Sequence, residues 1–384
     1  MDRSGGRIGD RVPAPADDNR PGGGDAADEV DDEPLGRDAP VGDRVQHGGR
    51  RRHRVSVGVC LQCRAMTAPS PDVTVLVPTY RRPQRLRRLL AALVEQTAPF
   101  DWELLVVDND PAGSARQVVE GVRPAFDVPI RYVIEGELGA VHARNRGLRE
   151  TGGRVVAMLD DDVVPRPGWL ATVCAPVLDG VASGAGGPVV LDAKVTRPRW
   201  FDEAGIGGYL TAHSLGSDQR ALAEDEILVT ANAAFDRSAL HRIGGFDARF
   251  GPRGRVQIVA DDAHLVRELM RAGGTLLWLP DAVVDHDLPK ERLTRRYLLR
   301  RAYWQGRSDW LLWGTDHVHR RFGGARVGVT LAGSWFRLQW RARRADGLHH
   351  LSVAFHLACD VARFTGVLTQ VVRTSRASGR VSPG

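Results

Sequence analysis

The chain has 384 residues, of which 42% are apolar and 26% are charged, and this composition is typical of a globular protein. Its 53 basic and 47 acidic residues give a formal net charge of +6. Four cysteines are too few for a disulfide framework in so long a chain, so we expect reduced thiols. The N-terminal residues lack the basic-then-apolar pattern of a signal peptide, and no apolar run reaches the roughly 20 residues that span a bilayer. We therefore expect a cytoplasmic protein.

The first 66 residues differ in composition from the rest of the chain. Glycine, proline, aspartate and arginine dominate them, and their apolar residues show no periodicity. Such a segment buries too little apolar surface to offset its ordering entropy, so we predict that residues 1–66 are disordered. Met66 directly precedes the first patterned residues, and a start codon assigned too far upstream is an alternative origin of this segment.

Short apolar runs alternate with helical patterns in the next hundred residues, which is typical of a parallel α/β sheet. The expected strands are Val73–Val77, Trp102–Val107, Pro129–Ile134 and Val155–Leu159. Helices are expected at Arg85–Gln96 and Ala140–Glu150. Right-handed crossovers place the carboxyl ends of such strands at one edge of the sheet. The residues that follow the strands, Pro78–Tyr80, Asp108 and Asp160–Asp162, are therefore expected to share one crevice.

The most informative stretch is the strand Val155–Leu159 and the three aspartates after it. The strand is apolar throughout, as expected for a strand covered on both faces. Asp160, Asp161 and Asp162 repel one another, so a cation is expected between them. At the carboxyl end of a central strand, a divalent metal that carries a phosphorylated ligand fits this position. The alternative is a solvated acidic turn.

The second half of the chain is less regular. Its expected strands are Gly184–Leu191, Thr230–Phe235, Thr275–Leu279 and Ala282–Val284. A short helix is expected at Ser238–Ile243. Asp261 and Asp262 begin a helix that is expected to run to about Ala272. Carboxylates in a first helical turn suit the helix dipole, so capping is an alternative to a catalytic role for this pair.

The region 291–384 combines basic and aromatic residues in helical patterns. A long helix is expected at residues 291–313, a basic aromatic stretch follows at 326–344, and a further helix is expected at 351–372. These helices either pack on the core or lie in a membrane interface, as basic amphipathic helices with tryptophan do. The sequence leaves both alternatives open.

Several motifs occur in an order that resembles the family-2 glycosyltransferases of GT-A fold, from about Val73 to Gln305. In chain order they are V-P-T-Y-R-R-P, L-L-V-V-D-N-D, A-R-N-R-G-L, M-L-D-D-D-V-V-P-R-P-G-W-L, G-G-F-D-A-R-F-G, A-D-D-A-H-L-V-R-E-L and V-D-H-D. The resemblance implies a nucleotide-diphospho-sugar transferase fold, with a mixed, mostly parallel central sheet flanked by helices. A catalytic domain is then expected at 67–290, with a nucleotide half at 73–162 and an acceptor half at 163–290, followed by a helical extension at 291–384.

The resemblance also implies a donor site for a nucleotide-diphosphate sugar. Its D-x-D motif would bind Mg²⁺ or Mn²⁺ through Asp160 and Asp162, with His286 completing the metal shell. The residues expected to bind the nucleotide are Pro78, Thr79, Tyr80, Arg81, Asp108, Asn109, Arg144, Asp160 and Asp161. Asn109 stands where relatives that use UDP-sugars often have aspartate, so a dTDP or GDP donor stays open.

Catalysis is expected from the residues that match the family's E-D motif. Asp262 is the candidate base, which removes the proton of an acceptor hydroxyl during a single displacement with inversion. Asp261 replaces the usual glutamate of this motif, and His264 stands where relatives have an acidic residue. The acceptor is a glycan, a lipid-linked sugar or a natural product. We expect no nucleic-acid partner. Peripheral contact of the C-terminal helices with the inner face of the membrane is a further expectation.

Two other functions compete with this interpretation. A sugar nucleotidyltransferase also uses metal and carboxylates, but it usually has a glycine-rich basic loop after the first strand, where this chain has Pro78, Thr79 and Tyr80. A non-catalytic, membrane-associated binding protein that kept the fold is the second alternative. The presence of Asp160, Asp162 and Asp262 together argues against it.

Overall fold

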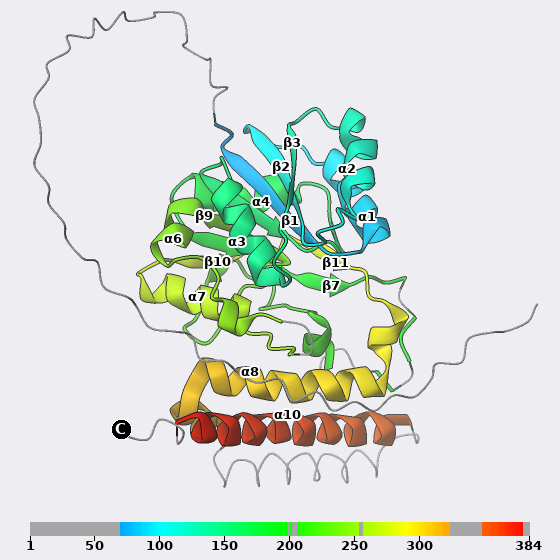
Figure 1. Ribbon diagram of the computed structural model, residues 1–384, viewed down its shortest axis with the longest axis vertical. Coiled ribbons are helices and arrows are strands. Elements are labelled where there is room, and N and C mark those ends of the chain that lie inside the picture. Colours follow the sequence, from blue (N-terminus) through cyan, green and yellow to red (C-terminus); the bar gives the residue numbers. More distant parts are fainter. Residues whose placement is uncertain are drawn as a thin grey trace, which may run out of the picture. The chain divides into compact units, whose positions relative to one another are not determined.

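The computed structural model describes residues 70–194, 196–198, 200–201, 206–252, 256–322 and 348–378, which belong to one compact unit (Figure 1). The segment predicted to be disordered, residues 1–66, lies outside the described residues. The basic aromatic stretch at 326–344 lies outside them as well.

The core of the unit is an eight-stranded, mixed sheet with the strand order β3-β2-β1-β4-β9-β6-β10-β8. The parallel strands of its first half are β1 (Val73–Thr79), β2 (Trp102–Asp108), β3 (Ile130–Ile134) and β4 (Val155–Leu159). The strands of its second half are β6 (Gly184–Gly186), β8 (Arg220–Ala221), β9 (Asn232–Asp236) and β10 (Leu276–Trp278). Strand β9 runs antiparallel to β4 and β6, whereas β10 pairs parallel with β6. The predicted mixed, mostly parallel sheet is confirmed.

Helices cover both faces of this sheet. On one face lie α1 (Pro83–Val94), α2 (Arg116–Val122) and α4 (Trp169–Leu178). On the other face lie α3 (Ala140–Glu150), α6 (Arg237–Arg242) and α7 (Asp261–Arg271). Helix α1 follows from its sequence, because its four buried leucines recur at helical spacing and form the face that packs on the sheet. Pro83 occupies its first turn, where proline is favoured. Helix α4 was not predicted, since it is apolar nearly all round and has no amphipathic pattern.

A second, three-stranded sheet corrects one prediction. The segment Gly184–Leu191 was expected to be a single strand, but it divides into β6 and β7 (Val189–Leu191), which belong to different sheets. At the division, a Cβ on Gly187 would lie 2.2 Å from the carbonyl oxygen of Ala282, and Pro188 has no N–H for a ladder. The second sheet has the order β5-β11-β7, with β5 at Val163–Pro165 and β11 at Val284–His286.

The C-terminal helices are α8 (Arg295–Phe322), which Gly314 interrupts with non-helical backbone angles, and α10 (Leu348–Ser378). They lie side by side (Figure 1). Their buried residues join those of β7 and of the 3-10 helices η2 (Gly207–Leu210) and η4 (Lys290–Leu293) in one apolar cluster. The remaining 3-10 helices are η1 (Arg123–Ala125) and η3 (Ala248–Phe250).

The expected helical extension is thus confirmed, and it packs on the core. Contact of the same helices with a membrane stays a prediction. Within the described ranges, no helix combines the length and the apolar character needed to cross a membrane.

Two glycines bring the backbones of α8 and α10 into contact. A Cβ on Gly306 of α8 would lie 1.8 Å from the carbonyl oxygen of Arg363, and one on Gly366 of α10 would lie 1.9 Å from that of Tyr303. Because no side chain fits at either crossing, the spacing of the helix pair depends on these glycines.

Candidate active site

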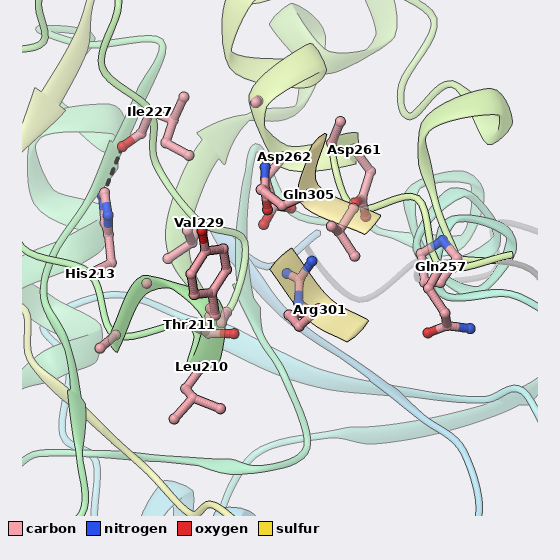
Figure 2. Close-up of a pocket in the computed structure, with 18 of the residues that line it drawn as sticks. Leu210, Thr211, His213, Ile227, Val229, Gln257, Asp261, Asp262, Arg301 and Gln305 are labelled. Atoms are coloured by element: carbon pink, nitrogen blue, oxygen red, sulfur yellow. Dashed lines mark hydrogen bonds between the residues drawn. The ribbon is translucent and has the colours of Figure 1, made fainter. Parts of the chain in front are cut away.

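A cavity of about 680 Å³ lies where the sheet meets the C-terminal helices. Its wall includes residues after β4, the start of α7, the segment 208–213 and one face of α8. The cavity brings together Asp160, Asp162, Asp262 and His286, which are far apart in the sequence. Figure 2 shows the part of the lining around Asp261 and Asp262.

The three aspartates after β4 separate into three environments. Asp160 accepts a hydrogen bond from Arg144 Nη2 at 2.8 Å. Asp161 is buried and accepts from Thr79 Oγ1 at 2.8 Å and from Arg82 Nη1 at 2.9 Å. Burial, opposed by Arg82, raises the pKa of Asp161 to about 6. Asp161 therefore ties the ends of β1 and β4 together instead of facing the cavity.

Asp162 is the most heavily compensated of the three aspartates. Arg82, Arg85 and Arg292 place guanidinium nitrogens 3.1, 3.5 and 3.6 Å from its Oδ2 atom. His286 Nε2 lies 3.5 Å from its Oδ1 atom. Burial opposes ionisation, but His286 and the arginines hold the pKa of Asp162 well below its usual range. The cations that the acidic triplet requires are thus supplied in part by arginines.

Asp162 and His286 also fit a divalent metal as two neighbouring ligands. Two donors of one octahedral ion lie about 3 Å apart, which is close to the distance between Asp162 Oδ1 and His286 Nε2. The carboxylate suits Mg²⁺ or Mn²⁺, whereas the imidazole suits transition metals and so makes Mn²⁺ the better match. The described residues contain no cluster of three or more such donors. An ion held here would therefore take its other ligands from a bound substrate and from water.

Arg144 connects the carboxylates after β4 with those at the start of α7. It comes from α3 and is buried, with Nη2 bonded to Asp160 and Nη1 bonded to Asp261 at 2.6 Å. Burial opposes its charge, but Asp160 and Asp261 raise the pKa of Arg144 above its usual range. Arg144 therefore stays charged and holds the two carboxylates at a fixed separation.

Asp261 and Asp262 begin α7 and both line the cavity. Burial and the charge of Asp262 raise the pKa of Asp261 to about 7, against the effect of Arg144. Burial also raises the pKa of Asp262, whose Oδ1 accepts a hydrogen bond from Thr230 Oγ1 at 2.6 Å. Neither side chain caps the helix. The pair is therefore suited to exchanging a proton near neutral pH.

Several residues expected to bind the nucleotide have other contacts. Asp108 is fully buried and accepts from the backbone N–H groups of Asp110 and Ala115 and from the hydroxyl of Tyr132. Asn109 is buried and bonds to the backbone of residues 135, 137 and 139. Both thus hold the loops at the end of β2 in place.

In the turn after β1, Arg82 and not the expected Arg81 reaches the cavity. Pro78 and Thr79 end β1, and Tyr80 is exposed. The side chain of Arg81 is 62% exposed and pairs with Asp110, whereas the next residue, Arg82, reaches the aspartates and the cavity.

Sequence reasoning missed some residues of the cavity wall. These are Arg82, Arg292, His213 and Arg301. It also missed Arg85 and Thr230, which contact the cavity carboxylates Asp162 and Asp262. Arg301 lines the cavity along α8 together with Tyr297, one turn before it, and Gln305, one turn after it. The three residues recur at a spacing of four. This spacing is visible in the sequence, but the many arginines of the helix conceal which of its faces is buried.

Comparisons with known proteins identify relatives of the chain. The family model described as "Glycosyl transferase family 2" matches residues 74–244. The succinoglycan biosynthesis protein ExoM of Rhizobium meliloti is 30% identical over 240 residues, which are 62% of this chain and 73% of that protein. The glucosyl-dolichyl phosphate glucuronosyltransferase of Haloferax volcanii is 28% identical over 245 residues, 62% of this chain and 75% of that protein.

A solved structure also aligns with part of the chain. The mannosyltransferase PcManGT from Pyrobaculum calidifontis, in complex with GDP-Man and Mn²⁺, aligns with 76% of this chain and 87% of its own, at 22% identity and a TM-score of 0.49. The sequence matches run through β1 to β9 and so include the acidic triplet and the strands that position it. With this likeness in sequence and with the expected sheet in place, the chain belongs to glycosyl transferase family 2 and is a glycosyltransferase.

Proposed function

We propose that the chain transfers a sugar from a nucleotide-diphosphate sugar to a hydroxyl group of an acceptor, with inversion at the anomeric carbon. One observation carries this proposal. Asp162 and His286, which suit the donor diphosphate, line the same cavity as Asp262, which suits an incoming hydroxyl. Arg144 links the two ends through its bonds to Asp160 and Asp261.

At the donor end, Asp162 and His286 would hold Mg²⁺ or Mn²⁺, with Asp160 beside them. Such an ion acts as a Lewis acid that stabilises the negative charge of the departing diphosphate. Arg82, Arg85 and Arg292 converge on the same carboxylate, and their forked N–H groups suit phosphate oxygens.

At the acceptor end, Asp262 would act as the base. Thr230 holds its Oδ1 atom, and the Asp262 side chain lines the cavity, where a hydroxyl proton can reach it. The acceptor oxygen bonds to the anomeric carbon while its proton moves to Asp262. The bond from that carbon to the diphosphate oxygen breaks, and its electron pair leaves with the nucleoside diphosphate. A raised pKa suits a base that works near neutral pH.

The test uses donor hydrolysis, in which water replaces the unknown acceptor, over a panel of UDP-, dTDP- and GDP-sugars with Mg²⁺ or Mn²⁺. We expect Asp262→Asn to lower turnover about a hundredfold or more, which is the range of general-base catalysis. Its affinity for the nucleoside diphosphate, measured by calorimetry, should not change. Asp162→Asn should instead remove the response to added metal. The control is Asp281→Asn, an equivalent change at an exposed position.

Three results would contradict the proposal. Normal turnover in Asp262→Asn would exclude this residue as the base. Release of pyrophosphate from a nucleoside triphosphate would favour a sugar nucleotidyltransferase. Binding of nucleotide sugars without hydrolysis or transfer would favour a binding protein that kept the fold.

A further inference from the structure

Arg301 is a charged residue at the acceptor end that the reaction described above does not use. It comes from the middle of α8 and lines the cavity one helical turn from Tyr297 and from Gln305. Its guanidinium points into the cavity, toward Asp261 and Asp262 (Figure 2). Arg301 is therefore placed to meet whatever occupies the space beside the base.

Arg301 differs from the other arginines of the cavity in its contacts. Its Nη1 atom is buried and has no hydrogen-bond partner. The others each lie against a carboxylate, as Arg144 does against Asp160 at 2.8 Å and Arg292 against Asp162 at 3.6 Å. Within the described residues, no carboxylate lies within ion-pair distance of Arg301.

A structural role as countercharge for the Asp261–Asp262 pair does not account for Arg301. Asp261 is already bonded to Arg144 at 2.6 Å, and Asp262 to Thr230 at 2.6 Å. Burial lowers the pKa of Arg301, with Tyr297 and Asp261 opposing this effect. An unpaired buried N–H donor is costly, so an arginine kept in this state is expected to gain a partner when the cavity fills.

We propose that Arg301 binds an anionic group of the acceptor, a phosphate or a carboxylate, and thereby holds the acceptor hydroxyl against Asp262. The proposal rests on the proposed glycosyl transfer. A guanidinium offers paired N–H donors in one plane, which match the oxygens of either anion. The hydroxyl of Tyr297 and the amide of Gln305 flank it on the same face of α8 and suit the hydroxyl groups of a sugar that carries the anion.

The test measures binding of three probes that share one ring, namely glucose, glucuronate and glucose 6-phosphate. Calorimetry is performed on the full chain with Mg²⁺ and a saturating nucleoside diphosphate, so that the donor end is filled. We expect one or both anionic probes to bind more tightly than glucose, by about tenfold to a hundredfold for a charged hydrogen-bonded contact. The preferred probe identifies the anion as phosphate or carboxylate.

The preference should disappear in Arg301→Gln and decrease in Arg301→Lys, which keeps the charge but loses the planar fork. Arg300→Gln is the matched control, because it removes the same charge from an exposed neighbour on the same helix. Thermal unfolding followed by circular dichroism identifies any variant that fails to fold, and Arg301→Lys then replaces Arg301→Gln.

Equal binding of the three probes, or a preference that survives in Arg301→Gln, would overturn the proposal. Loss of nucleoside-diphosphate affinity in Arg301→Gln would overturn it too, since it would place the guanidinium at the donor end. A wild-type chain that prefers the anionic probes through Arg301 but hydrolyses no nucleotide sugar would contradict the proposed function and leave the anion site standing.

Discussion

The donor end and the acceptor end of the cavity balance their charges in opposite ways. At the donor end, three arginines and His286 surround Asp162 and hold its pKa below the usual range. At the acceptor end, burial raises the pKa of both Asp261 and Asp262, and the buried Nη1 of Arg301 has no partner. The donor end is thus a compensated network suited to holding a permanent charge, whereas the acceptor end is suited to gaining and losing a proton.

Removing Arg144 is expected to have the largest effect, because this residue joins the two ends. Arg144→Gln leaves Asp160 and Asp261 without their shared cation, and loss of one partner of a buried ion pair costs about 3 kcal/mol or more. The free energy of unfolding, measured in urea, should fall by about that amount, and donor hydrolysis should fall with it.

The control for Arg144→Gln lies on the same helix. Arg146 is half-buried and pairs with Glu150 one turn away, so Arg146→Gln should cost less than about 1 kcal/mol. Equal stability loss in the two variants would mean that Arg144 contributes as an ordinary surface charge and that the two ends are not coupled through it.

Gly306→Ala tests whether the acceptor end can be disturbed alone. The added methyl group would meet the backbone of Arg363, and overpacking of this kind costs about 1–3 kcal/mol. We expect the α8–α10 pair to separate and binding of the anionic probes to weaken, while the affinity for a nucleoside diphosphate stays unchanged.

A second glycine provides the comparison for Gly306→Ala. Gly121 lies in α2 with open space around it, so Gly121→Ala should raise stability by about 0.5–1 kcal/mol through helix propensity. If Gly306→Ala were as harmless, or if it weakened nucleotide binding as much as probe binding, the two ends would not be separable in this way.

The smallest expected effect is a shift in pH dependence. The pKa of Asp261 is raised to about 7 in the folded chain, so the folded state keeps a proton that the unfolded chain releases near pH 4. This group therefore contributes most stability at low pH, and its contribution is lost as the pH rises from about 4 to about 7. Donor hydrolysis should increase over the upper part of the same range, as the pair ionises.

Asp261→Asn should move the midpoint of the pH–rate profile to lower pH, because the charge of Asp261 no longer opposes ionisation of Asp262. The measurement is donor hydrolysis between pH 5 and pH 9, at a fixed metal concentration. A midpoint that does not move would show that the titration belongs to another group.

The donor half could be predicted from the sequence more fully than the acceptor half. Buried parallel strands are continuous apolar runs, so β1 to β4 were located to within about two residues. The acidic triplet is recognisable in the sequence because three adjacent aspartates directly follow an apolar strand. Residues 192–226 show no clear pattern in the sequence, and the part of this stretch that lines the cavity does so through tertiary packing.

The arginines show why local pattern was not sufficient. Arg81 has a left-handed backbone conformation, with a φ of 52°, and its side chain pairs with Asp110. The neighbouring Arg82 reaches Asp161 and Asp162 instead. Sequence alone cannot assign directions within such a turn. In the same way, Arg300 is exposed and Arg301 faces the cavity, although the two are adjacent in a helix rich in arginine.

The small sheet β5-β11-β7 has a consequence for redesign of the metal preference. Main-chain pairing alone sets His286 opposite Val163, and the N–H of Asp287 bonds to the carbonyl oxygen of Asp162 at 2.8 Å. The ladder therefore fixes the separation of the two backbone positions, whichever side chain occupies position 286. Exchanging that imidazole for a carboxylate or a thiolate would vary the hardness of the donor set on a backbone of constant geometry.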